Sequence, residues 1–359
     1  MKKVLCYIDE LGSGGAERQI TNLAVLLKNK GYDVDVYCYH PIYFYEYTLV
    51  EHNIPLIKLE LKKNNYWNKI KNTREVLKKK KYDVIIAYSD GPVIIASILK
   101  IFYPKTRVIV SERNTTQSVT TKDRIKFFLF KFVDCIVANS FTQTNFIKSH
   151  FDTLKNKTYT ITNYIDTNKF TPGESKSNNG LLNIIVVARH SLQKNVPVFI
   201  EAVKIAKEKG INFHVDWYGE NGGGNKEKHE QLVKQYYLED VLSFWPSKMD
   251  IENYYRKATA FCLPSLYEGF PNVVCEAMSS GLPVICSNVC DNSFLVEDGV
   301  GGFLFDPKDP SDIALKIEKL SLLSHDEITK MGQFNRAKGE KLFSADIFVD
   351  KYIKLIEGV

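Results

Sequence analysis

Residues 264–285 read PSLYEGFPNVVCEAMSSGLPVI and carry the most informative pattern in the chain. The apolar run that precedes them is typical of a buried strand. Residues 272–280 have helical composition, with Asn272 as the expected N-cap and Gly281 as the stop signal. The stretch therefore predicts a strand, a loop, a helix and a second strand in succession.

Two glutamates flank the start of this predicted helix. Glu268 lies in the loop at the mouth of the predicted sheet, and Glu276 follows eight positions later within the helix. Gly269 allows the backbone to approach a ligand closely. The first N–H groups of the helix, within residues 270–274, are expected to attract phosphate, because a helix N-terminus carries a partial positive charge.

This stretch resembles the donor site of family 4 of the retaining glycosyltransferases. The family pattern is a Ser, an aromatic residue, Glu-Gly, a Pro, then Glu-Ala, a pair of small residues, Gly and Pro-Val, and the chain matches it throughout. Two glutamates at this spacing also occur by chance in many helices, but the accompanying Gly and Pro residues argue against chance. The resemblance implies an α/β chain of the GT-B fold, which has two Rossmann-like domains with parallel sheets facing a central cleft.

The resemblance also implies roles for individual residues of this stretch. Glu276 would bond the ribose hydroxyls of a nucleotide-sugar, and Glu268 would contact the donor sugar or lie beneath its reacting face. The implied donor-binding residues here are Glu268, Gly269, Phe270, Pro271, Asn272 and Glu276.

Arg189 and Lys194 directly follow the first predicted strand of the second half, and they resemble the family's cationic clamp for the donor pyrophosphate. The leaving nucleotide gains negative charge as the glycosidic bond breaks, and two fixed cations would stabilise that charge in the transition state. No metal and no other cofactor is then expected. The alternative is that both are ordinary surface charges. His190 is expected to be a loop residue without a catalytic role.

No carboxylate nucleophile is evident in the sequence. The resemblance therefore implies retention by front-side attack, in which the leaving phosphate takes the proton of the acceptor. The catalytic residues are expected to be Arg189, Lys194 and Glu268.

A Gly-rich turn at residues 11–18 follows the first predicted strand. Such turns occur in many nucleotide-binding folds, and this one lacks the spacing of the dinucleotide fingerprint. In the family the turn faces the donor phosphate and the acceptor, so the resemblance implies that a ligand closely approaches the backbone at Gly14 and Gly15. Glu17 is either an acceptor-side residue or a first-turn residue favoured by the helix dipole.

Two further loops contain candidate residues that depart from the family pattern. Gly219 ends a predicted strand where family members have a Gly-acid-Gly that borders the nucleotide base, but Asn221 intervenes here. Arg113 and Asn114 occupy the place where many relatives have a His that lines the sugar site. They are acceptor-side candidates by position only.

At 359 residues the chain is long enough for two domains. Strands alternate with helices in both halves, which indicates parallel sheets covered on both faces. A polar segment at 171–183 reads as a linker. The expected parts are an N-terminal acceptor-side domain at 1–172, a C-terminal nucleotide-sugar donor domain at 173–343, and a helix at 344–359 that the resemblance implies packs back on the first domain. Strands are predicted at 3–8, 34–39, 84–87, 107–110, 135–138, 158–161, 183–188, 213–218, 241–245, 260–263 and 283–286.

The two halves of the chain differ in charge. Residues 1–175 hold 27 Lys and Arg against 17 Asp and Glu, whereas residues 176–359 hold 21 against 25. A basic half predicts an anionic partner, and no nucleic-acid motif accompanies it. The basic and aromatic segment 121–133 favours an anionic membrane surface, although a core helix with solvated lysines is the alternative. The membrane-contact candidates are Lys122, Arg124, Lys126, Phe127, Phe128 and Lys131.

The spacing of the seven cysteines is not that of metal ligands, so we expect reduced, mostly buried thiols. No apolar run reaches the length of about 18 residues that is needed to cross a membrane. We therefore expect a cytoplasmic hexosyltransferase that is peripheral at the inner face of the cell membrane. Its partners would be a UDP-sugar donor and a lipid-linked saccharide acceptor in bacterial surface polysaccharide biosynthesis, such as O-antigen or capsule, and not nucleic acid. Two alternatives remain open: a sugar-nucleotide epimerase of the same fold, and a nucleotide-sugar-binding partner that has lost turnover.

Overall fold

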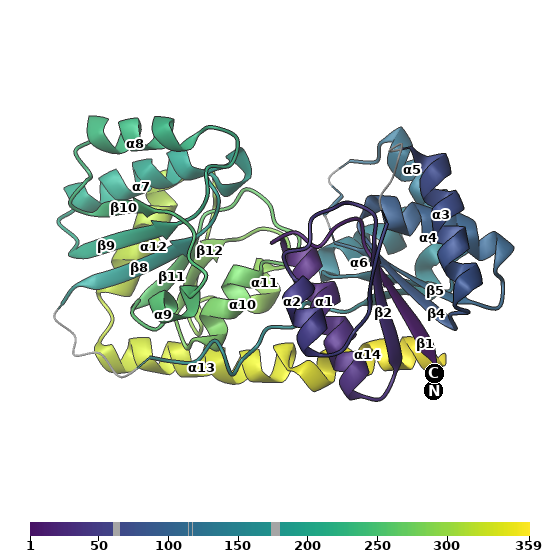
Figure 1. Ribbon diagram of the computed structural model, residues 1–359. Coiled ribbons are helices and arrows are strands. Elements are labelled where there is room, and N and C mark those ends of the chain that lie inside the picture. The colour runs from purple at the N-terminus through teal and green to yellow at the C-terminus, as the bar shows by residue number, and fades with distance from the viewer. Residues whose placement is uncertain (60–64, 114, 117, 174–179) are drawn as a thin grey trace. The chain divides into compact units, whose positions relative to one another are not determined.

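The computed structural model describes residues 1–59, 65–113, 115–116, 118–173 and 180–359. The chain divides into two compact units (Figure 1). Unit 1 comprises Met1–Tyr164 together with Ala345–Val359, and unit 2 comprises Ile165–Ser344. Residues 174–179 of the predicted linker lie outside the described residues.

Unit 1 contains a seven-stranded parallel sheet in the order β3-β2-β1-β4-β5-β6-β7. The register pairs Val4 with Val34 on one side and with Val84 on the other. All five residues of β4 are buried, as expected for a parallel strand with helices over both faces. The strands are Lys3–Tyr7 (β1), Asp33–Cys38 (β2), Leu56–Lys58 (β3), Val84–Tyr88 (β4), Arg107–Glu112 (β5), Cys135–Ala138 (β6) and Thr158–Thr160 (β7).

The helices of unit 1 form two layers around this sheet. Buried side chains of α3, α4, α5 and α6 share one apolar core with one face of the sheet, and those of α1, α2 and α14 share a second core with the other face. The helical elements are Gly15–Asn29 (α1), Glu46–Glu51 (α2), Tyr66–Lys79 (α3), Asp90–Phe102 (α4), Thr121–Leu129 (α5), Phe141–His150 (α6), the 3-10 helix Asp152–Lys157 (η1) and Ala345–Glu357 (α14).

The C-terminal helix α14 belongs to unit 1 although the whole of unit 2 precedes it in the chain. Its residues Phe348 and Tyr352 are buried in the same core as Val4 of β1. The Tyr352 hydroxyl lies 2.6 Å from the hydroxyl of Tyr88, at the end of β4. Apolar packing and this buried hydrogen bond therefore hold the end of the chain on the sheet of unit 1.

Unit 2 contains a six-stranded parallel sheet in the order β10-β9-β8-β11-β12-β13. Trp217 of β9 is fully buried, and its indole N–H donates to the carbonyl oxygen of Ala188 at 2.7 Å. The strands are Leu182–Val187 (β8), Phe213–Tyr218 (β9), Leu242–Trp245 (β10), Ala260–Leu263 (β11), Val284–Ser287 (β12) and Gly302–Phe305 (β13). The helical elements are the 3-10 helix Leu192–Lys194 (η2), Val196–Glu208 (α7), Lys226–Gln235 (α8), Ile251–Tyr255 (α9), Asn272–Ser279 (α10), Asn292–Leu295 (α11), Pro310–Ser321 (α12) and His325–Phe343 (α13).

The sequence does not predict β3 or β13, which are both edge strands. β3 has only three residues, all of them partly or fully exposed, so it lacks the apolar run of a buried strand. β13 begins at Gly302, whose φ of 150° lies outside the range that most residues adopt. A side chain there would collide with the carbonyl of Val284 on β12, so packing requires glycine at this position. In the sequence a glycine indicates a turn, and the strand is therefore not predicted.

Candidate functional site

The loops after β8 and β11 place two predicted charged residues in direct contact. Lys194, the last residue of η2, lies with its Nζ atom 2.5 Å from Glu268 Oε1. Only 13% of the Lys194 side chain and 8% of the Glu268 side chain are exposed. The strand order reverses between β8 and β11, and in open α/β sheets ligands bind beyond the carboxyl ends of the strands at such a point.

Backbone and side-chain hydrogen bonds hold these two loops together. The backbone N–H of Leu266 donates to the carbonyl oxygen of Gln193 at 2.8 Å. The Gln193 side-chain amide donates to the carbonyl oxygen of Tyr267, also at 2.8 Å. Sequence reasoning missed Gln193, because no motif shows which distant backbone groups an amide will bind.

The last residue of β12, Ser287, and Cys290 in the loop after it support the Glu268 loop from the other side. The Ser287 hydroxyl donates to the carbonyl oxygen of Ser265 at 2.6 Å. The Glu268 backbone N–H donates to Cys290 Sγ at 3.5 Å, and Cys290 has a φ of 49°. The main chain at Glu268 is thus fixed by three loops, which preorganises its carboxylate.

Arg189 follows β8 by two positions and has an exposed side chain. Its guanidinium forms no hydrogen bond or ion pair with any residue that the structure describes. Arg189 is therefore a cation available to a ligand, whereas the charge of Lys194 is already balanced by Glu268.

His190 lies in the loop after β8, as the sequence predicts, but its side chain is part of the core. It is fully buried, and its Nδ1 lies 3.0 Å from Nδ1 of His229 on α8. Its ring packs at 88° against Phe244, with ring centroids 4.7 Å apart. Burial, and then the neighbouring His229, lower the pKa of His190 to about 4, so it is neutral at pH 7.

The start of α10 differs in detail from the sequence prediction. Pro271 occupies the N-cap position, and Asn272 is the first helical residue, so the prediction of Asn272 as N-cap is wrong. Pro271 lacks an N–H, and its carbonyl accepts the backbone N–H groups of Val274 at 3.1 Å and Cys275 at 3.3 Å. Helix formation thus consumes the N–H of Val274, one of the groups expected to attract phosphate.

Glu276 lies in the middle of α10 and is 3% exposed. Its Oε2 atom accepts a hydrogen bond from the Tyr255 hydroxyl at 3.2 Å. Tyr255 comes from α9 and was not predicted from the sequence. Phe270 is buried and packs against Phe343, with ring centroids 6.2 Å apart, so only its backbone is available to a ligand. Gly281 ends the helix with a φ of 67°, as predicted.

Gly219 at the end of β9 is required by packing. A side chain there would overlap the carbonyl oxygen of Ala188, at the end of the neighbouring strand β8. The next residue, Glu220, accepts hydrogen bonds from the hydroxyl and the backbone N–H of Ser247, and these bonds lower the pKa of Glu220. The loops after β9 and β10 are therefore tied to each other at the position that the resemblance assigns to the nucleotide base.

A side chain of the Gly-rich turn in unit 1, that of Glu17, occupies part of the space beside the turn. The Glu17 carboxylate lies against Gly14, in the space that a Cβ on Gly14 would occupy. Burial is the main cause that raises the pKa of Glu17, and Asp9 and Glu10 raise it further. Close approach of a ligand to Gly14 thus requires the Glu17 side chain to move, while Gly15 is exposed.

Arg113 lies at the end of β5 and is half-buried. Its guanidinium carbon is 4.7 Å from the ring centroid of Tyr88, and its Nη2 donates to Asn163 Oδ1 at 2.5 Å. Its Nε and Nη1 atoms are buried without a partner among the described residues. The other candidate from this loop, Asn114, lies outside the described residues.

Comparison with known proteins decides the family. A model of Glycosyltransferase Family 4 matches residues 13–169, and a model of Glycosyl transferases group 1 matches residues 168–338. Together they span both units. The chain belongs to glycosyltransferase family 4.

Two relatives and one solved structure illustrate this membership. An uncharacterized glycosyltransferase of Haemophilus influenzae is 26% identical over 370 residues, which cover 100% of both chains. The amylovoran biosynthesis glycosyltransferase AmsD of Erwinia amylovora is 27% identical over 304 residues, covering 79% of this chain and 80% of that protein. The crystal structure of HepE from Anabaena in complex with UDP has a TM-score of 0.86 at 18% identity, and covers 99% of this chain and 100% of that chain. The glycosyltransferase therefore has the predicted GT-B fold of two Rossmann-like domains.

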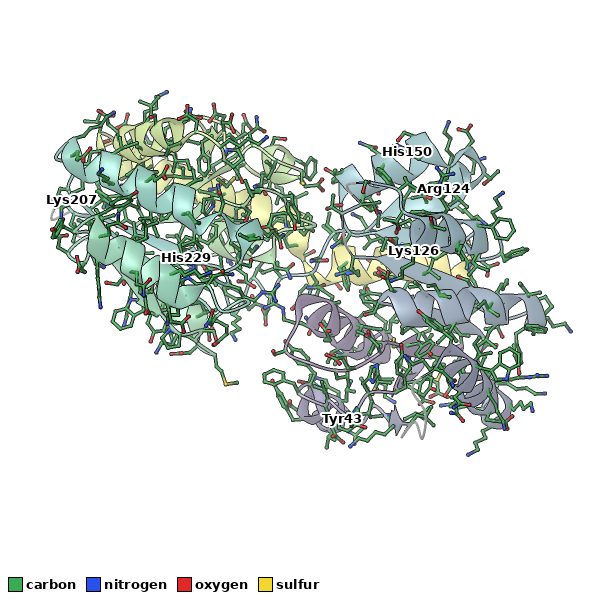
Figure 2. All side chains as sticks on the ribbon, turned by 90° about the horizontal axis from the view of Figure 1, so that it is seen from above. Tyr43, Arg124, Lys126, His150, Lys207 and His229 are labelled. Carbon is green, nitrogen blue, oxygen red and sulfur yellow. The ribbon has the colours of Figure 1, made fainter. Side chains whose placement is uncertain are left out.

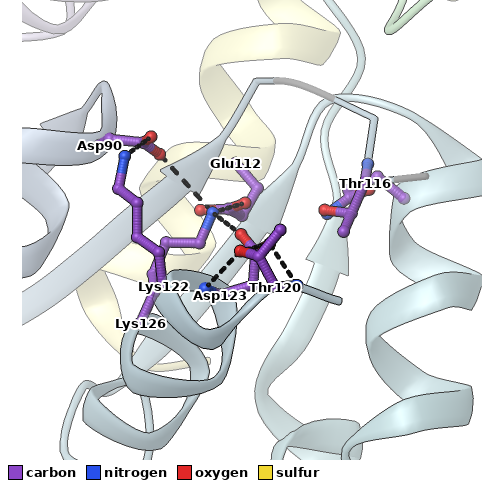
Figure 3. Close-up of polar contacts among 8 residues, drawn as sticks. Asp90, Glu112, Thr116, Thr120, Lys122, Asp123 and Lys126 are labelled. Carbon is purple, nitrogen blue, oxygen red and sulfur yellow. Dashed lines mark hydrogen bonds and ion pairs between the residues drawn. The ribbon is translucent and has the colours of Figure 1, made fainter. Parts of the chain in front are cut away.

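In this glycosyltransferase the predicted membrane contacts of Lys126 and Phe127 are wrong. Lys126 is 5% exposed and Phe127 is 1% exposed, because both side chains of α5 point into unit 1. Lys126 Nζ lies 2.8 Å from Glu112 Oε2, and Asp90 and Asp123 are also within ion-pair distance (Figure 3). Burial lowers the pKa of Lys126, but the three carboxylates outweigh burial, so that its pKa is raised and it stays charged.

The other candidates of α5 lie on its outer side. Arg124, Phe128 and Lys131 are exposed, and Lys122 is exposed while paired with Asp90 at 2.9 Å. Two further apolar side chains are exposed here: Phe132, which the basic and aromatic segment 121–133 includes, and Ile125, which was not predicted as a membrane contact.

The remaining features of the glycosyltransferase concern metals, thiols and membrane spans. Among the residues described, no group of three or more His, Cys, Asp or Glu could hold a metal ion. All seven cysteines are free, and six of them are buried, as predicted. No helix within the described ranges is long and apolar enough to cross a membrane.

Proposed function

We propose that this glycosyltransferase transfers a sugar from a UDP-sugar to a lipid-linked glycan of a bacterial surface polysaccharide, with retention and without a metal. The observation that carries the proposal is the contact of Lys194 with Glu268 at the switch point of the unit 2 sheet, in the same half of the chain as Arg189, which has no ion-pair or hydrogen-bond partner among the described residues. Two cations and one acceptor of hydroxyl hydrogen bonds would suit the pyrophosphate and the sugar of a nucleotide-sugar.

The cations act on the leaving group. When the bond between the anomeric carbon and the phosphate oxygen breaks, its electron pair goes to that oxygen. Arg189 and Lys194 stabilise the charge, and such preorganised donors each contribute on the order of 10²-fold in rate. The acceptor oxygen attacks from the same face, and its proton passes to the leaving phosphate. Glu268 accepts hydrogen bonds from the hydroxyls of the sugar.

The Glu276 carboxylate serves the nucleotide in this proposal. It is buried and accepts a hydrogen bond from the Tyr255 hydroxyl, and a carboxylate has enough acceptor sites to bind the two ribose hydroxyls as well. A uridine nucleotide is favoured by the structure of HepE, which contains UDP, and a polysaccharide product by the relative AmsD, whose name refers to amylovoran biosynthesis.

The membrane part of the proposal rests on the outer face of α5. Ile125, Phe128 and Phe132 are 57%, 56% and 44% exposed. Ile125 and Phe128 lie one turn apart on α5, and the ring of Phe132, just after the helix, has its centroid 6.1 Å from that of Phe128, so the three form one stripe. Arg124 and Lys131 flank this stripe. Apolar side chains between cations are suited to the anionic inner face of a bacterial membrane, where a lipid-linked acceptor would be anchored.

A ligand and turnover screen tests the activity. UDP-glucose, UDP-galactose, UDP-N-acetylglucosamine and GDP-mannose are added one at a time, and melting temperature, nucleotide release and the sugar's NMR spectrum are recorded. We expect one UDP-sugar to raise the melting temperature and to release UDP slowly without acceptor. Conversion to an epimeric sugar would instead identify an epimerase. Binding without release or conversion would identify a partner that has lost turnover, and no binding by any nucleotide-sugar would contradict the donor site.

A further inference from the structure

Unit 1 has an exposed aromatic surface that the proposed function does not use. It lies in residues 41–50, which read PIYFYEYTLV and which we call the aromatic segment. Ile42, Phe44, Tyr47 and Val50 are 47%, 43%, 63% and 67% exposed, while Leu49 is buried and anchors α2. Four large exposed apolar side chains within ten residues form an unusual concentration, and such patches on proteins mark binding sites.

The aromatic segment is held firmly at the carboxyl edge of the unit 1 sheet. It follows β2, and the backbone N–H of Leu11, after β1, donates to the carbonyl oxygen of Ile42 at 2.9 Å. A parallel bridge pairs Leu11 with Tyr43, which Figure 2 labels in unit 1. The Ile42 side chain reaches Gly12 of the Gly-rich turn, lying 3.8 Å from the position of a Cβ there. The segment and the turn are therefore one continuous surface.

The charge of this surface excludes an anionic partner. No Lys or Arg occurs between Lys30 and Lys58, and Lys58 itself is paired with Glu46 at 2.6 Å. Asp9 and Glu10 lie at the adjoining end of β1. The aromatic segment thus combines aromatic rings with neighbouring carboxylates, and Lys58, whose Nζ lies 4.3 Å from the centroid of the Tyr43 ring, is paired with Glu46, in contrast to the exposed Arg124 and Lys131 near α5.

Aromatic rings beside carboxylates match the chemistry of a neutral sugar. The C–H face of a pyranose packs on a flat aromatic ring, and its hydroxyls donate hydrogen bonds to carboxylate oxygens. We propose that the aromatic segment binds neutral sugar units of the acceptor glycan, with Phe44 and Tyr47 as the stacking residues. This inference rests on the proposed function, because it identifies the class of acceptor that the transferase would extend.

Saturation-transfer NMR with maltose, cellobiose, lactose and N,N′-diacetylchitobiose tests the proposal. The wild type should receive signal transfer with at least one of these sugars. The double variant Phe44→Ala/Tyr47→Ala should weaken that binding by about tenfold or more, because both stacking contacts are lost. The matched control is Phe102→Ala at the end of α4, which removes an equally exposed ring from the same unit.

Three outcomes decide against the proposal. It is wrong if none of the four sugars binds the wild type, if the double variant binds as well as the wild type, or if Phe102→Ala loses binding to the same extent. The shift in melting temperature caused by UDP, measured on the same samples, tests the donor site independently of sugar binding by the aromatic segment. A UDP shift that is absent in the wild type contradicts the proposed function, whereas a UDP shift that is retained in the double variant while sugar binding is lost supports the aromatic segment specifically.

Discussion

Lys194 Nζ and Glu268 Oε1 lie 2.5 Å apart, although 74 positions separate the two residues in the chain. The contact joins the loops after β8 and β11, between which the order of the sheet reverses. Both side chains are largely removed from water, so the attraction is weakly screened. A substitution at either residue should therefore change both the stability of unit 2 and the charge that a donor meets.

We expect Lys194→Ala to reduce both stability and turnover. It leaves the buried charge of Glu268 without its cation, which should lower the free energy of unfolding by about 3 kcal/mol. Loss of a preorganised cation should also reduce UDP release by on the order of 10²-fold. Urea unfolding and a UDP-release assay measure the two effects.

The double variant Lys194→Ala/Glu268→Gln is the control for this prediction. It removes both charges, so it should regain most of the lost stability while remaining inactive. If Lys194→Ala unfolds at the same urea concentration as the wild type, the ion pair contributes nothing to the fold.

Arg189→Ala should reduce turnover without reducing stability. The Arg189 side chain is exposed and has no partner among the residues described, so its removal breaks no contact of the folded chain. UDP release should fall on the order of 10²-fold, while the melting temperature stays at the wild-type value. Arg189→Lys keeps the positive charge but loses the forked geometry of the guanidinium, so its rate of UDP release should lie between those of the wild type and Arg189→Ala. Wild-type turnover in Arg189→Ala would remove this residue from the site.

Glu276→Gln should weaken the binding of UDP itself, because a neutral amide accepts weaker hydrogen bonds from ribose hydroxyls than a carboxylate does. Tyr255→Phe should weaken UDP binding less, since it removes only the hydrogen bond that orients Glu276. Glu268→Gln should leave UDP affinity nearly unchanged and reduce sugar transfer. Titration calorimetry with UDP compares the three variants. Equal losses of affinity in Glu276→Gln and Glu268→Gln would show that their roles are wrongly assigned.

The sequence shows that Arg189 and Glu268 lie in loops that follow buried strands of unit 2. Arg189 and Glu268 follow apolar runs, and parallel strands bring such ends to one edge of a sheet. The contact of Lys194 with Glu268 could not be predicted. The contact depends on how the two loops pack against each other. Gln193 holds them together by hydrogen bonds to the backbone of Leu266 and Tyr267, which no sequence pattern predicts.

The error on α5 has a different physical origin. The segment 121–133 is rich in bases and aromatic residues, and composition alone does not show which of them face inward. Lys126 is buried because Glu112, at the end of the preceding strand β5 and 14 positions away, supplies the opposite charge. A base is expected at the surface unless such a partner exists, and only the tertiary structure shows the partner.

Turnover should not require a divalent metal. Arg189 and Lys194 supply two positive charges, which can replace the charge of a metal at the leaving phosphate. UDP release in excess EDTA should therefore equal release in magnesium-containing buffer. Activity that disappears in EDTA and returns with Mn²⁺ or Mg²⁺ would contradict this prediction.

The outer face of α5 should bind anionic vesicles at low salt. Arg124 and Lys131 each contribute about 1 kcal/mol near an anionic surface, so Arg124→Glu/Lys131→Glu should weaken binding roughly 30-fold or more. Phe128→Ser/Phe132→Ser should weaken it as well, because their exposed rings can no longer insert. Co-sedimentation with vesicles of phosphatidylglycerol and phosphatidylcholine, at low and high salt, measures each effect.

Tyr237→Ser is the matched control for the aromatic substitutions, because Tyr237 is 80% exposed and belongs to unit 2, which does not contain α5. It should bind vesicles as the wild type does. Salt should weaken the binding of the wild type, since ions screen charges beyond about 10 Å at 0.1 M. If the charge-reversed variant sediments with anionic vesicles as well as the wild type does, then α5 is not the membrane contact. In that case its exposed phenylalanines have another role, and the basic residues beside them are merely solvated.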